Sequence, residues 1–347
     1  DGFKKYAVIT LDALIVPPAV TKKLQLLLPE IGYDLSQVYM SATHTHCSVG
    51  GWADSWLGNQ FAGEFNEKIV NDLASSIIIT IKKAEEKLLN ATIGFGKYNA
   101  GKFVRNRLVG DKGATDPWFR IIKIEKSNGS IGIITSFAAH ATIYSDKQMQ
   151  YSRDYPGAIV DSLEQLKHID MAAFCAGAVG SHSPNIKGSN GSEKISKLSS
   201  ELFSLAFENI ENIELKNINS ISSILFDIPL REPHMRITES LRLRPWVFNR
   251  LTEESKAYLS LLKIGDIILV GTPCDFSGEL VSNIESNAKQ NNHNIMVTSF
   301  NGGYIGYITN DKWYNLKKYE TFTMNWFGPY NGSYFVYLIN NLIELII

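Results

Sequence analysis

The sequence predicts an α/β fold with a mixed β-sheet core flanked by helices. Short apolar runs rich in β-branched residues alternate along the chain with longer segments of helical periodicity. Asn128-Gly129 is a typical hairpin turn between two of the strand-like runs, so some neighbouring strands are expected to be antiparallel. We found no internal repeat or linker and therefore expect a single domain over residues 1–347.

The expected elements of the first half of the chain are strands with one long and one short helix. Strands are expected over 6–14, 37–42, 91–98, 119–126 and 130–138, and helices over 20–28 and 61–89. In the second half, helices are expected over 155–166, 194–212, 276–290 and 334–346, and strands over 171–176, 220–230, 264–271 and 295–300.

Composition limits the classes of function. Of the 347 residues, 44% are hydrophobic and 20% charged, as in an ordinary globular protein with a sizeable core. The net charge of −1 gives no indication of broad electrostatic binding to nucleic acid. No apolar run reaches the roughly 18 residues that span a bilayer, and the N-terminus reads as a trimmed start without its signal sequence. Cys47, Cys175 and Cys274 are expected to be small buried hydrophobes.

Polar side chains with useful chemistry follow several predicted strands. In open α/β sheets, ligands bind outside the carboxyl ends of the strands. We therefore expect one site at that edge of the core. The residues that follow predicted strands in this way are His44, His46, His140, Ser183, Asp275 and Tyr304.

The pair His44 and His46 is the first candidate. In an extended segment, residues i and i+2 point to the same side, so two imidazoles can share a metal or divide ligand and acid/base roles. A hydrogen-bonded structural pair is the other interpretation. His140 alone would more often be structural, but a catalytic zinc site needs about three protein ligands and an open position.

Three further segments have both functional and plain structural interpretations. The turn 177–185 could form an oxyanion hole or present a nucleophile, or be an ordinary glycine-rich turn. Asp275 could ligate a metal or cap a helix. Tyrosines at 304, 307 and 319 could simply pack, or could ligate a metal or donate to an oxyanion.

Taken in order, several motifs resemble the neutral/alkaline non-lysosomal ceramidase family. They are Ser41-Ala42-Thr43-His44-Thr45-His46 with Gly50-Gly51, Asn106-Arg107, Phe137-Ala138-Ala139-His140, the turn from Gly180 to Asn185, Pro273-Cys274-Asp275-Phe276-Ser277, Tyr304 to Thr309, and Tyr319-Glu320. The resemblance runs from near residue 6 to about residue 330. It implies the family's catalytic domain without its C-terminal immunoglobulin-like domain.

The resemblance also implies a role for each matching residue. The Zn²⁺ ligands would be His44, His140, Asp275 and Tyr307. His46 would be the acid/base, and Ser183, Arg107 and Tyr319 would line the substrate amide and the developing oxyanion. The implied reaction is hydrolysis of an N-acyl, ceramide-like amide by metal-activated water, with attack by Ser183 as the other route. A small-molecule or lipid amide substrate, peripheral membrane contact and a secreted, periplasmic or cell-envelope location are implied as well. No feature indicates an oligomeric state.

Departures from the family pattern keep alternatives open. Asp275 stands where the family has glutamate, with Glu279 a less favoured substitute, and Ser181 and His182 alter the turn near the substrate. The alternatives are an amidase or esterase of the same fold with a non-sphingolipid substrate, a catalytically inactive cell-envelope binding protein, and metal-free hydrolysis by Ser183.

Overall fold

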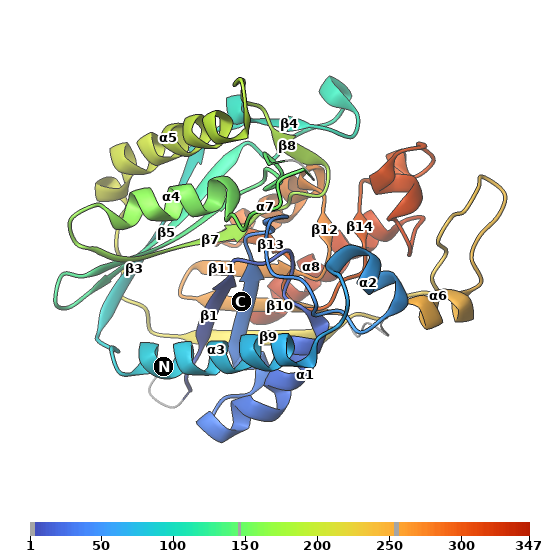
Figure 1. Cartoon of the computed structure of the whole chain (residues 1–347). Coiled ribbons are helices and arrows are strands. Elements are labelled where there is room, and N and C mark those ends of the chain that lie inside the picture. The colour runs from blue at the N-terminus through green and yellow to red at the C-terminus, as the bar shows by residue number, and fades with distance from the viewer. Residues whose placement is uncertain (1–3, 145–146, 253–256) are drawn as a thin grey trace.

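The computed structural model describes residues 4–144, 147–252 and 257–347, and two four-stranded sheets stack there between layers of helices (Figure 1). Buried side chains from both sheets, including Ile122, Ile134, Leu269 and Met296, fill the space between them. The predicted mixed α/β class is confirmed. Residues 1–3, part of the segment read as a trimmed start, lie outside the described residues.

The first sheet has the order β3-β5-β6-β7. Its strands are β3 (Ala91–Asn99), β5 (Trp118–Lys126), β6 (Ile131–Phe137) and β7 (Ile169–Ala176). β5 and β6 form the predicted hairpin, with Gly129 at φ 84° in its turn, and β7 runs parallel to β6. Alternate side chains of each strand point to opposite sides of the sheet. Helices α4 (Asp154–Glu164) and α5 (Gly191–Asn209) pack on the apolar side chains of its outer face.

The second sheet has the order β13-β11-β10-β9 and is covered by α7 (Val281–Gln290) and α8 (Asn331–Ile346). Its strands are β9 (Ile221–Asp227), β10 (Tyr258–Ile264), β11 (Ile267–Thr272) and β13 (Asn294–Ser299). The prediction of one strand over 264–271 is wrong at its start. Gly265, at φ 60°, instead turns the chain between β10 and β11, so Ile264 ends one strand and Ile267 begins the next.

A parallel pair, β1 (Ala7–Leu11) and β2 (Val38–Ala42), lies beside the two sheets and packs against α1 (Pro18–Leu27) and α3 (Glu67–Glu85). The predicted helix over 61–89 is observed as α3 alone, whereas residues 61 and 62 end a separate, shorter helix, α2 (Trp56–Ala62). Gly63 ends α2 at φ 78°, and the side chain of Asn66 accepts a hydrogen bond from the Lys68 amide to begin α3. These two end signals override the continuous apolar periodicity.

Short elements complete the edge where β2, β6, β7, β11 and β13 end. They are β4 (Val104–Asn106), β8 (His182–Pro184), α6 (Pro245–Leu251), β12 (Asp275–Phe276), β14 (Tyr307–Ile308) and a π-helical turn (Tyr319–Thr323). Cys175 and Cys274 are buried, as expected, whereas Cys47 is half-buried. In the described part of the chain, none of the helices is both long and apolar enough to span a membrane.

Candidate metal centre

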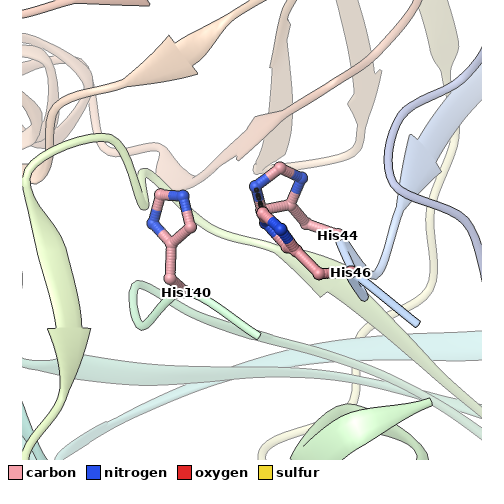
Figure 2. Close-up of side chains that lie close together, drawn as sticks. All are labelled: His44, His46 and His140. Carbon is pink, nitrogen blue, oxygen red and sulfur yellow. Dashed lines mark hydrogen bonds between the residues drawn. The ribbon is translucent and has the colours of Figure 1, made fainter. Parts of the chain in front are cut away.

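Three histidines from two chain segments converge at the carboxyl ends of the strands. His44 and His46 follow β2, and His140 follows β6. One ring nitrogen of each lies within 4.8 Å of the others, and the three side chains lie close together (Figure 2). The Nε2 atoms of His44 and His46 are 3.2 Å apart. His44 and His140 are buried, while His46 is the exposed member of the cluster.

The protein fixes the orientation of His44 in three ways. Its Nδ1 lies 2.6 Å from the carbonyl oxygen of Leu14, so it donates there and Nε2 is left with a lone pair. Its ring stacks on Phe300 at 3.8 Å between centroids. Its backbone has φ 60°, a left-handed conformation that costs a non-glycine residue energy and that clusters at functional sites.

His140 is oriented in the same manner. Its Nδ1 lies 2.8 Å from the carbonyl oxygen of Val179 and 3.2 Å from that of His182. Both carbonyls belong to the turn 177–185, so this turn holds a histidine that follows the neighbouring strand. The Nε2 of His140 is thereby left as an acceptor that faces the cluster.

Asp275 completes the centre from β12. Its Oδ1 lies 3.1 Å from Nε2 of His140 and 3.7 Å from Nε2 of His44. This oxygen is buried and has no hydrogen-bond partner among the described residues, whereas Oδ2 accepts from the Tyr304 hydroxyl at 2.7 Å. A buried carboxylate oxygen aimed at two imidazole lone pairs is costly unless a cation binds between them. The donor set therefore fits a divalent cation, with nitrogen and oxygen ligands of the kind zinc accepts.

Tyr307 and Arg107 lie on one side of this point. The Tyr307 hydroxyl is 3.4 Å from Nε2 of His140 and accepts a hydrogen bond from Arg107 at 3.0 Å. Arg107 is itself fixed by Glu320, whose Oε1 lies 2.8 Å from its Nε. The half-exposed Tyr319 packs its ring 5.7 Å from that of Tyr307. The structure thus brings seven of the eight predicted site residues together.

Ser183 is the exception among the predicted site residues. Its hydroxyl accepts from Nε of Arg105 at 3.1 Å, in the short β4–β8 pair. The neighbouring His182 is buried, and its ring contacts the Asp116 amide and the Ser181 hydroxyl instead of Ser183. Glu279 accepts from Nε1 of Trp313 at 2.9 Å, so it does not take the place of Asp275.

Electrostatics favour the neutral form of all three histidines. Burial lowers the pKa of His44 and His140 well below the ordinary value of 6.5. The pKa of His46 is lowered too, first by desolvation of its ring and then by the charge of Arg107, although Asp275 opposes the shift. Neutral imidazoles keep their lone pairs at pH 7, as metal ligation and proton acceptance both require.

These shifts predict how stability depends on pH in the metal-free protein. His44 and His140 bind protons more weakly in the folded than in the unfolded chain, so unfolding takes up protons below their unfolded pKa of 6.5. We expect the free energy of unfolding to be level near pH 7 and to fall as the pH decreases below about 6.5. Urea titrations of chelator-treated protein between about pH 7.5 and 5.5 measure this, above the range where most carboxylates titrate.

The matched control replaces both His44 and His140 by glutamine. His182, whose pKa burial lowers to about 4, contributes with the same sign and stays in both proteins. The double variant should therefore lose less stability over the same range. Equal slopes in the two proteins would contradict the account.

Tyr304 is predicted to support metal binding without ligating. Tyr304→Phe removes the hydroxyl that donates to Asp275 Oδ2 and keeps the ring, which packs on Trp326. Loss of such a supporting bond weakens metal affinity about 10- to 100-fold. Competition with a chromogenic chelator measures the change. Tyr98→Phe, which removes a hydroxyl bonded to the Asn209 carbonyl far from the centre, should leave the affinity unchanged.

A cavity of about 350 Å³ opens directly onto the centre. His44, His46 and Asp275 lie at its polar end, and its walls are mainly apolar and aromatic, with Phe61 from α2 and Phe248 from α6. Tyr319 also lines it. A second cavity, of about 540 Å³, lies on the other side of His46 and is lined by Cys47, Tyr144 and Met149 among others. The histidine cluster and Asp275 therefore form the polar end of a mainly apolar pocket.

The comparisons with known proteins all match ceramidases. Residues 3–204 match the model of the family described as neutral/alkaline non-lysosomal ceramidase, N-terminal. The neutral ceramidase of Pseudomonas aeruginosa is 28% identical over 174 residues, which is 46% of this chain and 26% of that protein. The crystal structure of neutral ceramidase from Pseudomonas aeruginosa superposes with a TM-score of 0.82 at 18% identity, covering 98% of this chain and 66% of the other.

A second structure, of a ceramidase complexed with C2, gives a TM-score of 0.83 at 18% identity over 97% of this chain. Again 66% of the other chain is covered, so this chain spans about two thirds of the length of both solved structures.

Proposed function

The chain belongs to the neutral/alkaline non-lysosomal ceramidase family, and from this premise we propose that it hydrolyses the amide bond of an N-acyl lipid with the help of a bound Zn²⁺. The observation that carries the proposal is the buried Oδ1 of Asp275, which faces Nε2 of His44 and His140 without a hydrogen bond from any described residue. His44, His140 and Asp275 would hold the ion, with the Tyr307 hydroxyl at the margin of the site. A bound zinc ion would polarise the amide carbonyl and activate water.

His46 is proposed as the residue that moves the proton. It is exposed to the cavity, and its lowered pKa leaves the ring neutral near pH 7. A neutral imidazole can accept the proton of the attacking water and then pass it to the leaving amine nitrogen. The amine would otherwise leave as an unstable anion, so this transfer is required for the bond to break.

Arg107 and Tyr319 are proposed to stabilise the negative charge that develops on the carbonyl oxygen. Arg107 is oriented by Glu320 and Tyr307, and its charge lies beside the centre. Burial, and then the charge of Asp275, raises the pKa of Tyr319, so its hydroxyl keeps its proton and can donate a hydrogen bond. Preorganised donors of this kind contribute roughly 3 kcal/mol each to the stability of an oxyanion.

The apolar wall of the cavity supports a lipid-like substrate over a short polar one. Phe61, Phe248 and Trp326 offer aromatic surface to an acyl or alkyl chain.

Assay of N-acylsphingosine beside N-acyl alkylamines and simple esters tests the proposal. Cleavage of N-acylsphingosine that is lost with a chelator and restored by zinc supports it. Cleavage of alkylamides or esters alone would favour the amidase or esterase alternative, and absence of zinc and of all turnover would favour an inactive binding protein.

Metal-free serine catalysis has less geometric support. Nucleophilic serine requires a base within hydrogen-bond distance, and the Ser183 hydroxyl bonds to the Arg105 guanidinium, which cannot accept a proton. Activity that resists complete zinc removal would nevertheless favour Ser183 as the nucleophile.

Tyr319→Phe tests the proposed oxyanion donor. Loss of one donor typically lowers kcat about 100-fold or more. Because Tyr319 is 49% exposed, we expect folding, and also zinc content, to be unchanged. Steady-state kinetics with metal analysis measures both. Tyr330→Phe removes a hydroxyl from another exposed tyrosine and serves as the control. A kcat within twofold of wild type in Tyr319→Phe would show that the hydroxyl does not stabilise the oxyanion.

A further inference from the structure

The distance between His140 and Asp275 is already close to that between two ligands of one zinc ion. Nε2 of His140 and Oδ1 of Asp275 are 3.1 Å apart. Zinc bonds to nitrogen and oxygen are about 2.0–2.2 Å long and meet near the tetrahedral angle, so two ligand atoms of one ion lie roughly 3.4 Å from each other. The protein itself therefore holds the two side chains near the required distance, and the contacts between their supporting segments decide how well a cation fits.

The supporting segments are the turn 177–185 and β12. His140 is oriented by two carbonyl oxygens of the turn, those of Val179 and His182. Asp275 is the first residue of β12. A movement of the turn relative to β12 would therefore change the distance between the two candidate ligands.

Backbone contacts join the turn to β12 on the Val179 side. The amide of Gly180 donates to the carbonyl oxygen of Phe276 at 2.7 Å, and Val179 and Ser277 pair as an isolated antiparallel bridge. The two segments approach so closely that a Cβ atom on Gly180 would lie 2.3 Å from the carbonyl oxygen of Asp275. A glycine is therefore required at this position. These contacts fix the first of the two carbonyls that orient His140.

Two buried serines extend this joint toward His182. The hydroxyl of Ser181, in the turn, and that of Ser277, directly after β12, form a hydrogen bond at 2.6 Å. Both side chains are 0% exposed, so water does not compete and the low dielectric strengthens the bond. Because Ser181 immediately precedes His182, this bond fixes the second carbonyl as the backbone contacts fix the first.

We propose that Ser181 and Ser277 are positioning residues that act as one unit, and that their mutual hydrogen bond keeps His140 and Asp275 at the distance a zinc ion requires. Neither serine lines the cavity, so neither would contact the substrate. The inference rests on the proposed function, because it takes His140 and Asp275 as zinc ligands. It adds a cause for their spacing in the metal-free protein.

Simple packing would not require the two hydroxyls. Where a buried hydrogen-bonded pair has no further role, two apolar side chains of similar shape serve nearly as well. A hydrogen bond differs from an apolar contact because it has a preferred distance and direction. A serine pair at the joint between two ligand-supporting segments therefore favours a role in their geometry.

A double-mutant cycle of zinc affinity in the full chain tests the proposal. Ser181→Ala and Ser277→Ala each remove the bond, so each should lower zinc affinity about tenfold, the lower end of the range for groups that support a ligand. The double variant should lose no more than either single variant, since the same bond can be lost only once. Competition with a chromogenic chelator measures the affinity, and thermal unfolding with excess chelator measures the stability of the metal-free protein.

Ser199→Ala is the matched control. Ser199 is also buried, and its hydroxyl donates to the carbonyl oxygen of Ser196 at 3.1 Å within α5. Its loss should leave zinc affinity within twofold of wild type, whatever it does to the Tm. Circular dichroism checks the folding of every variant. If one of the single variants at the joint does not fold, the other single variant and the control make the same comparison.

Three results would overturn the proposal. Losses that multiply in the double variant would show that the two serines act independently. Zinc affinities within twofold of wild type in both single variants would show that the bond does not set the spacing, and wild-type protein that binds no zinc would exclude the role as well. Failure of the proposed function alone appears differently: the coupled loss of zinc affinity is observed, but wild-type protein cleaves no N-acyl amide.

Discussion

Replacement of His44 by asparagine is expected to abolish zinc binding and amide hydrolysis together. His44 supplies one of the two buried imidazole lone pairs that face Asp275, and its loss leaves the site short of ligands. Loss of only the hydrogen-bond partner of a ligand costs up to about 100-fold in affinity, so loss of the ligand itself should cost more. Asparagine is chosen because His44 has φ 60°, a conformation that asparagine tolerates better than alanine.

Metal analysis and turnover of the His44→Asn protein measure the effect, with circular dichroism as the test of folding. His293→Asn is the matched control, because the ring of His293 bonds to the nearby Asn291 carbonyl and is not part of the cluster of His44, His46 and His140. The control should retain zinc and activity. Full zinc content and wild-type activity in His44→Asn would show that His44 is not a metal ligand.

Asp275→Asn is expected to separate metal affinity from stability. The buried Oδ1 of Asp275 has no hydrogen-bond donor, so in the metal-free protein its negative charge is poorly compensated. An asparagine amide could donate to Nε2 of His140, which lies 3.1 Å from that oxygen. We therefore expect the metal-free variant to have a Tm about 2 °C or more above that of metal-free wild type. Zinc affinity should fall at least about 100-fold and activity with it.

Thermal unfolding with chelator and with added zinc measures both effects. Zinc should raise the Tm of wild type but hardly that of Asp275→Asn. Asp116→Asn is an informative contrast, because Asp116 is equally buried but forms a bidentate ion pair with Arg120. That variant should be destabilised, since it breaks the bidentate pair and leaves the buried arginine charge with Glu285 as its remaining partner. Destabilisation of metal-free Asp275→Asn would show that its carboxylate is satisfied by the protein alone.

The meeting of the candidate metal ligands could be predicted from the sequence because their positions follow local rules. Polar residues that come directly after apolar runs lie at strand ends, and parallel strands end at one edge of a core. His44, His140 and Asp275 meet for this reason, although they are separated by up to 231 residues of chain as their numbers show. Alternation along the strands likewise predicts which residues face each helix layer.

Other features depend on contacts that no local pattern records. The position of Ser183 is decided by the pairing of β8 with β4, which turns its hydroxyl to Arg105. The carbonyl of Leu14 and the ring of Phe300 orient His44, yet neither carries a chemical signal in the sequence. The division between α2 and α3 could have been read from Gly63 and Asn66, had these end signals been weighed against the periodicity.

The most direct test of the account is anomalous X-ray scattering from crystals of the zinc-loaded protein, recorded on both sides of the zinc absorption edge. We expect one strong peak between Nε2 of His44, Nε2 of His140 and Oδ1 of Asp275, at about 2.0–2.2 Å from each. The same peak should be absent from crystals of Asp275→Asn. No peak at this point in wild type, or a peak bound only by histidines elsewhere on the surface, would contradict the assignment of the centre.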